Sequence, residues 1–165
     1  MFLSSRRHEI GIEFLYQLTG PGWSECTLIV HESSITVTAS SLSDGLRSLI
    51  SAICRVVDGI SDATASFAEE PGEYRWRLYR IDEATIRILI LEFDELWSHR
   101  PDTDGKPIFD VRCRLHNFAG AVYHGCVELL EEYGHEGYKD QWRKHEYPSE
   151  EIDTLKRLLN SENTG

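Results

Sequence analysis

The chain has 165 residues, of which 41% are hydrophobic and 10% aromatic, and its 28 acidic and 17 basic residues give a formal net charge of −11. This length is typical of one domain with a sizeable core, and the apolar content excludes a disordered acidic chain. The negative charge disfavours nucleic acid and anionic membranes as partners and favours a basic protein or a cationic ligand, although solubility alone also accounts for it.

No apolar run approaches the ~20 residues that a membrane span needs, and residues 1–8 lack the order of a secretory signal. We therefore expect a cytoplasmic protein without membrane contact. The cysteines are scattered singly, at Cys26, Cys54, Cys113 and Cys126. Each lies in an apolar pattern, which is typical of a buried free thiol; a zinc site or a disulfide would require the fold to bring them together. No metal or cofactor is expected.

The first elements in chain order are strands. Residues 9–18 have a mixed period and fit either a strand or a short helix, and the Gly-Pro-Gly sequence that follows ends either one. Residues 26–37 alternate between apolar and polar positions around a turn at 32–34. This alternation predicts a β-hairpin.

A helix should follow this hairpin. Ser41-Leu42-Ser43-Asp44 has the spacing of a capping box, and apolar residues then recur every three or four positions from Leu46 to Val57. Gly59 suits the left-handed cap at the end of such a helix.

The middle of the chain carries the strongest strand pattern. Apolar and charged residues alternate in three segments, 74–79, 86–91 and 111–115, with Asp82-Glu83 as a tight turn between the first two. A shorter strand around 64–68 should precede them. Successive strands joined by short connections predict an antiparallel sheet.

Helical periodicity returns near the C-terminus. One apolar stripe runs from Phe118 to Tyr133 and should stop at Gly134, residues 138–144 fit a short helix or a turn, and Pro148 can begin a final helix. The chain should thus be a single α+β domain over residues 1–165, an antiparallel β-sheet covered on one face by helices. Residues 1–8 and 161–165 are expected to be disordered.

Strand alternation places several arginines on the sheet face that the helices do not cover: Arg75, Arg77, Arg87, Arg112 and Arg114. Cross-strand carboxylates such as Glu73, Glu92 and Asp110 would neutralise this face, as is ordinary for an exposed antiparallel sheet. Open guanidinium groups, with Tyr79 as a stacking surface, would instead make an anion- or RNA-binding module. The overall charge favours the first interpretation, so nucleic acid is not the expected partner.

Other motifs are weak. None of the seven histidines has the spacing of a metal or catalytic pair, although His116 or His124 in a pocket would support a small enzyme. The Asp102–Gly105 segment resembles the start of a calcium loop, but its glycine comes two positions early and the distal glutamate is missing. A turn is the better interpretation.

A partner-binding surface is predicted between the third and fourth strands of the middle region. Acidic residues there flank one large aromatic that belongs to no periodic stripe, and together they form the candidate site: Asp94, Glu95, Trp97, Asp102 and Asp104. Carboxylates would steer a basic protein towards this surface, and a tryptophan would retain it.

Two motifs carry a resemblance. The sequence from Glu70 to Trp76, Glu-Pro-Gly-Glu-Tyr-Arg-Trp, enters a predicted strand, and Gly137-Tyr138-x-x-x-Trp142 leads to Tyr147-Pro148 before the last helix. In this order of elements the second half of the chain resembles small bacterial proteins of uncharacterised families, some of them similar to immunity proteins of polymorphic toxin systems. The resemblance implies a non-enzymatic inhibitor of a basic toxin, and it assigns no site residue to this chain.

Overall fold

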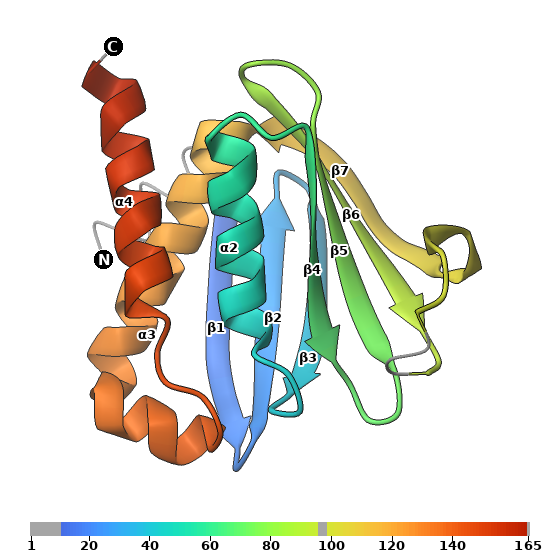
Figure 1. The fold of residues 1–165 in the computed structure, drawn as a ribbon, viewed down its shortest axis with the longest axis vertical. Helices are drawn as coiled ribbons and strands as arrows, with labels where there is room; N and C mark the ends of the chain where they lie inside the picture. The colour runs from blue at the N-terminus through green and yellow to red at the C-terminus, as the bar shows by residue number, and fades with distance from the viewer. Residues whose placement is uncertain (1–10, 96–98, 165) are drawn as a thin grey trace.

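The computed structural model describes residues 11–95 and 99–164, which form a single α+β domain, as the sequence predicted (Figure 1). Its elements in chain order are β1 (Ile12–Gly20), β2 (Trp23–Val30), β3 (Ser33–Ser40), α2 (Gly45–Val57), β4 (Asp62–Ala68), β5 (Glu73–Arg80), β6 (Thr85–Phe93), η1 (Asp102–Asp104), β7 (Lys106–Arg114), α3 (Leu115–Trp142) and α4 (Ser149–Thr164). The expected disorder of residues 1–8 concerns residues outside the described ranges, and that of residues 161–165 stays a prediction.

The strands form two antiparallel sheets. Sheet A has the order β1-β2-β3, and sheet B has the order β4-β5-β6-β7. The ambiguous segment at 9–18 is strand β1, because its alternate residues, including Phe14 and Tyr16, enter the core while β2 pairs along its length. The predicted hairpin at 26–37 is the β2–β3 pair.

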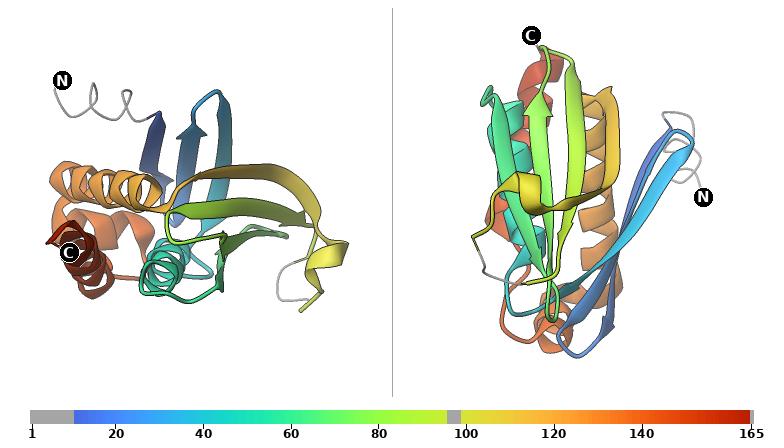
Figure 2. Two further views of the ribbon diagram at one scale, coloured as in Figure 1. Left: turned by 90° about the horizontal axis from the view of Figure 1, so that it is seen from above. Right: turned by 90° about the vertical axis from the view of Figure 1, so that its right-hand side faces the viewer.

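The helices lie on one side of each sheet (Figures 1 and 2). Helix α2 packs on β4 and β5, α3 runs along β1, and α4 covers α2 and α3. The buried side chains join into one core, whose largest members are Trp76, Trp142, Tyr138, Phe14 and Phe67. The four cysteines are free and buried, as expected, and burial raises the pKa of Cys54 and Cys113 to about 11.

The capping box predicted for α2 is wrong. The N-cap is Asp44, whose side chain makes no cap hydrogen bond and instead receives one from Arg47 Nε at 2.9 Å. Ser43 faces sheet B, where its hydroxyl accepts a hydrogen bond from Ala68 N at 3.1 Å. Gly45, the first residue of the helix, packs closely on Phe67: a Cβ there would lie 2.8 Å from the Phe67 ring, so a glycine fits this position best.

Gly134 bends α3 rather than ending it, which corrects the expected stop. Its φ of 69° interrupts the helical path, and the helix resumes and continues to Trp142. The bend returns Tyr138 and Trp142 to the core, where both are fully buried. The predicted short helix or turn at 138–144 is this second part of α3.

Helix α3 closes the β1 edge of sheet A. A Cβ at Gly125 would lie 2.5 Å from the Phe14 carbonyl oxygen, so the helix backbone touches the strand directly. Further along, the Tyr133 hydroxyl donates a hydrogen bond to the Leu18 carbonyl at 3.2 Å. The helix therefore covers an edge that would otherwise be open to another strand, while the outer face of the sheet stays uncovered.

Candidate functional site

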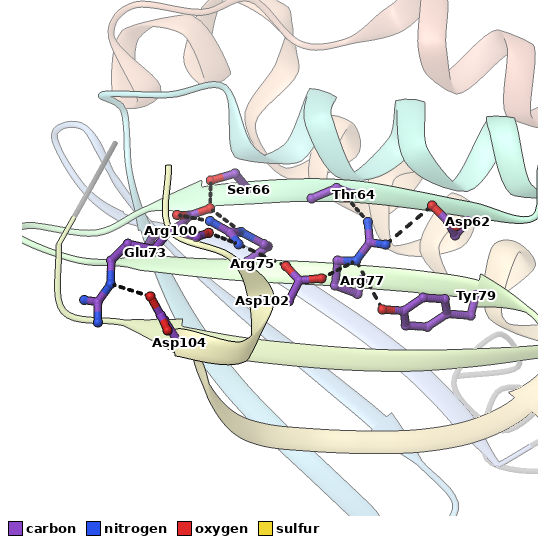
Figure 3. A network of polar contacts seen from close by, with 10 residues as sticks. All are labelled: Asp62, Thr64, Ser66, Glu73, Arg75, Arg77, Tyr79, Arg100, Asp102 and Asp104. Carbon is purple, nitrogen blue, oxygen red and sulfur yellow. Dashed lines mark hydrogen bonds and ion pairs between the residues drawn. The ribbon is translucent and has the colours of Figure 1, made fainter. Parts of the chain in front are cut away.

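Sheet B presents arginines on the face that points away from the helices, as strand alternation predicted. Trp76 and Leu78 of β5 enter the core, whereas the side chains of Arg75 and Arg77 project outwards beside them (Figure 3). Arg87 of β6 lies on the same face, opposite Tyr79 in the strand register. We call this surface the arginine face.

Asp102 lies across the arginine face. Its turn, η1, folds back over the sheet, and its two carboxylate oxygens each approach one guanidinium at 3.0 Å: Oδ1 that of Arg75 and Oδ2 that of Arg77 (Figure 3). The two arginine side chains are only 13% and 16% exposed. One internal carboxylate thus bridges the two cations.

Further contacts complete the pairing of Arg75. Glu73 lies 3.3 Å from its Nε, the Arg100 carbonyl accepts a hydrogen bond at 2.8 Å, and the guanidinium stacks 4.1 Å from the centre of the Phe93 ring. Glu73 is itself buried and accepts a second hydrogen bond from the Ser66 hydroxyl at 2.8 Å. This ion pair is therefore shielded from water on several sides.

Arg77 and Arg87 are neutralised in the same way. Asp62 lies 3.4 Å from Arg77 Nη2, and Arg77 also donates to the hydroxyl groups of Tyr79 and Thr64. Arg87 binds both carboxylate oxygens of Asp110, at 2.9 and 2.8 Å. This hydrogen bonding holds the pKa of Asp110 below its usual range. For these arginines, the interpretation of a neutralised sheet face is confirmed.

Arg112 and Arg114 complete the predicted set. Both side chains are exposed, and neither forms an ion pair with any other described residue. They lie on the edge strand β7, away from the Asp102 bridge. Of the predicted face, only Arg112, which lies opposite Arg87 in the strand register, and Arg114 thus remain for an external anion.

The residues of the predicted partner site differ in their contacts. Asp94 and Glu95 are exposed at the end of β6. Asp102 is held by the arginine face, and Asp104 lies 3.5 Å from Arg100 Nε. Trp97 lies outside the described residues. Only Asp94 and Glu95 therefore combine exposure with a carboxylate that no described cation pairs.

Asp94 borders a hollow that the sequence did not reveal. It has a volume of about 330 Å³, and its wall comes from the β4–β5 turn and the end of β6: Glu69, Pro71, Gly72, Glu73, Tyr74, Glu92, Phe93 and Asp94. Of the described residues, four carboxylates and no Lys, Arg or His line it. Burial raises the pKa of Tyr74, and the charges of Glu92 and Glu69 raise it further.

We call the exposed and half-buried acids around this hollow the acidic rim: Glu69, Glu70, Glu92, Asp94 and Glu95. Sequence alone showed Glu69 and Glu70 only as members of an acidic turn. Their neighbours Glu92 and Asp94 come from another strand, and the β5–β6 register that sets Tyr74 opposite Glu92 brings them there. Lys106 is the cross-strand neighbour of Glu92 on its other side.

A larger hollow lies elsewhere, between the end of α3 and the start of α4, with a volume of about 620 Å³. Both acidic and basic side chains line it, and some of them pair with one another: Lys139 Nζ lies 3.4 Å from Glu146 Oε1. A wall of compensated charge selects neither an anion nor a cation, so it does not define a ligand.

His116 and His124 line a smaller groove of about 300 Å³ between α3 and α4, together with Tyr123 and Lys156. Its described wall contains no carboxylate and no Ser, Thr or Cys. A nucleophilic hydroxyl or thiol of Ser, Thr or Cys is therefore not among the described residues that line this groove with the two histidines.

Within the described ranges, no three His, Cys, Asp or Glu side chains gather as a metal site would require. Nor is any helix there long and apolar enough to cross a membrane. The Asp102–Asp104 segment is a 3₁₀ turn, consistent with the turn interpretation of this motif.

No protein-family model matches the sequence, and comparison with curated proteins and with solved structures finds no significant similarity.

Proposed function

We propose that the chain is a non-enzymatic binding protein whose acidic rim docks on a basic protein. The hollow inside the rim is the observation that carries this proposal. Glu69, Glu92 and Asp94 line it beside Glu73, which pairs with Arg75, and no described Lys, Arg or His lines it. Carboxylates around a concave site attract a cationic partner, raise its rate of association and reject partners of like charge.

Tyr74 gives the hollow a second means of holding a cation. Tyr74 lines the hollow, and the charges of Glu92 and Glu69 lie close enough to raise the pKa of its hydroxyl group. A lysine or arginine side chain that enters between two carboxylates and over an aromatic ring gains ion pairs and a cation–π contact together. The wall thus supports recognition of a basic side chain.

The state of the arginine face argues against the alternative of an RNA-binding module. Arg75, Arg77 and Arg87 are paired with internal carboxylates, so phosphate groups would have to displace Asp102, Asp62 and Asp110. Phosphate contacts dominate the affinity of such modules, and here the best-placed cations are already neutralised.

In its most specific form, the proposal is an immunity-type inhibitor that binds and blocks a basic bacterial toxin in the cytoplasm. The support for this form is the resemblance of the Glu70–Trp76 and Gly137–Trp142 motifs, and the first of these motifs forms part of the wall of the hollow.

Affinity capture with the purified chain tests the proposal. We expect the wild type to retain a basic protein from a lysate of the cells that encode it. The variant Asp94→Lys/Glu95→Lys should bind this protein about tenfold more slowly and with less dependence on salt, because steering charges act mainly on association. The matched control Asp82→Lys/Glu83→Lys changes the same charges on the exposed β5–β6 turn and should bind nearly as the wild type does.

Equal association rates for the two variants would contradict the acidic rim as the docking site. Retention of RNA instead of a basic protein would favour the arginine face. If the captured protein is toxic when produced alone, co-production with the chain should abolish its toxicity.

A further inference from the structure

Sheet A, and α3 as far as Tyr138, contain no strong cation. Residues 11–46 and 115–138 include no Lys or Arg, and each of these segments ends just before a basic residue, Arg47 or Lys139. The two segments carry these carboxylates: Glu13, Glu25, Glu32, Asp44, Glu128, Glu131, Glu132 and Glu136. Because α3 packs along β1, the two segments form one side of the molecule.

No described helix covers the outer face of sheet A. Both views of Figure 2 show the helices on the other side of β1, β2 and β3. Short side chains cover much of this face, and a hydrogen bond of 2.9 Å joins the hydroxyl groups of Thr27 and Thr36 across the strands. Leu15, which faces Thr27 in the register, is 37% exposed, and Ile29 is half-buried nearby. A flat surface with a small apolar centre results.

Carboxylates border this centre on two sides. On one side, Glu132 of α3 lines a shallow groove with Leu15 and Gln17 of β1. On the other side, Glu25 of β2 faces Thr38 of β3 across the strands. Residues 11–46 and 115–138 contain no Lys or Arg, and among the described residues neither Glu25 nor Glu132 forms an ion pair.

The outer face of sheet A is also continuous with the acidic rim. The Thr38 hydroxyl donates a hydrogen bond to the Glu69 carboxylate, and Glu69 belongs to the wall of the hollow. Glu25 and Glu69 thus stand on either side of Thr38. A partner seated at the rim would meet the sheet A face next.

We propose that the outer face of sheet A is a docking surface for the same basic partner, which covers it with a flat cationic face and places an apolar side chain against Leu15. This inference rests on the proposed function and extends it from one hollow to a whole sheet face. A second copy of the chain is disfavoured as the occupant because it would bring carboxylates against carboxylates. A nucleic acid is repelled for the same reason.

A decalysine peptide and the ¹⁵N-labelled full chain provide the test. In low salt, the peptide should shift the amide signals of Thr27, Thr36 and Thr38 together with those of the acidic rim, and it should leave Arg87 and Asp110 unchanged. The variant Glu25→Gln/Glu132→Gln should lower the affinity roughly fivefold. The control Glu83→Gln/Asp153→Asn removes two exposed charges elsewhere and should lower it less than twofold.

The outcomes separate this inference from the proposed function. Shifts confined to the acidic rim would overturn the inference and leave the proposed function standing. Peptide binding nowhere on the chain would overturn both. Equal losses of affinity in the two variants would show general charge attraction and would also overturn the inference. A Leu15→Lys variant with wild-type stability that binds a captured basic partner as tightly as the wild type does would contradict the apolar contact.

Discussion

The outer faces of the two sheets differ in whether their charged side chains are paired within the protein. The arginine face of sheet B holds three cations that bind carboxylates of the same chain. The outer face of sheet A holds no strong cation at all, and its carboxylates border small polar and apolar side chains. Both faces are exposed antiparallel surfaces, yet the inner arginines of the first are paired with carboxylates, whereas the strands of the second carry carboxylates and no Lys or Arg.

The difference shows that a charged residue in the sequence is not necessarily free to bind a partner, because its charge can already be paired within the fold. The arginines of sheet B are the most conspicuous charged pattern in the sequence. Two of them, Arg75 and Arg77, bind Asp102 and so hold the segment after β6 against the sheet. The unbalanced negative charge is found where a pattern is absent, in the long segments without Lys or Arg. We therefore propose that partner recognition lies on sheet A and the acidic rim rather than on the arginine face.

The largest expected effect comes from breaking the support of sheet A. Replacing Gly125 by alanine places a Cβ 2.5 Å from the Phe14 carbonyl oxygen, so α3 has to move away from the β1 edge. We expect a loss of about 3 kcal/mol in the free energy of unfolding, measured by urea denaturation.

Gly120→Ala is the matched control, because it lies in the same helix and a Cβ there meets nothing within 4 Å. It should increase stability by up to about 1 kcal/mol, as alanine favours a helix interior over glycine. Equal effects of the two substitutions would contradict the close contact of α3 with β1.

A smaller effect should distinguish two arginines of the same face. Arg75→Ala leaves the buried carboxylate of Glu73 without its cation, and we expect a loss of about 2 kcal/mol in the free energy of unfolding. Arg112→Ala removes an exposed side chain without an ion pair to any described residue and should change it by less than about 0.5 kcal/mol. Comparable losses in the two variants would mean that Arg75 is not part of a shielded network.

The smallest effect concerns the exposed pair of Arg87 and Asp110. The hydrogen bond from Arg87 lowers the pKa of Asp110 in the folded state, so the pair stabilises the fold above the unfolded pKa of about 3.9 and loses this effect as the pH falls through the folded value. In Arg87→Ala, the Asp110 pKa should return towards its usual range. At neutral pH the free energy of unfolding should fall by less than about 1 kcal/mol.

A titration of the Asp110 carboxyl carbon by NMR, in the wild type and in Arg87→Ala, checks this prediction. An unchanged pKa in the variant would show that Arg87 is not the cause of the shift.

Sequence patterns predicted the local features of the fold and failed where distant segments meet. The strands of sheet B, the placement of its arginines and the burial of the cysteines follow from alternation along each strand. The separation into two sheets does not, because it depends on which strands pair across the chain. Gly134 was recognised as a breaker, but the return of Tyr138 and Trp142 to the core was not.

The candidate site shows the same limit. The exposure of Asp94 and Glu95 agrees with their position in a polar connection. The ion pairs of Asp102 with Arg75 and Arg77 depend instead on how η1 folds back over sheet B. The hollow around Tyr74 depends on the register that brings Glu92 beside Tyr74. Neither the Asp102 ion pairs nor this hollow can be predicted from the spacing of residues close together in the sequence.

The contrast between the two faces can be tested by measuring the electrostatic potential near each of them. NMR relaxation enhancements from a cationic and an anionic nitroxide report this potential at individual amide groups. Our account predicts a much larger ratio of cationic to anionic enhancement at Thr27 and Thr36 of sheet A than at Thr64 and Leu89 of sheet B. Equal ratios on the two faces, or a larger ratio on sheet B, would contradict it.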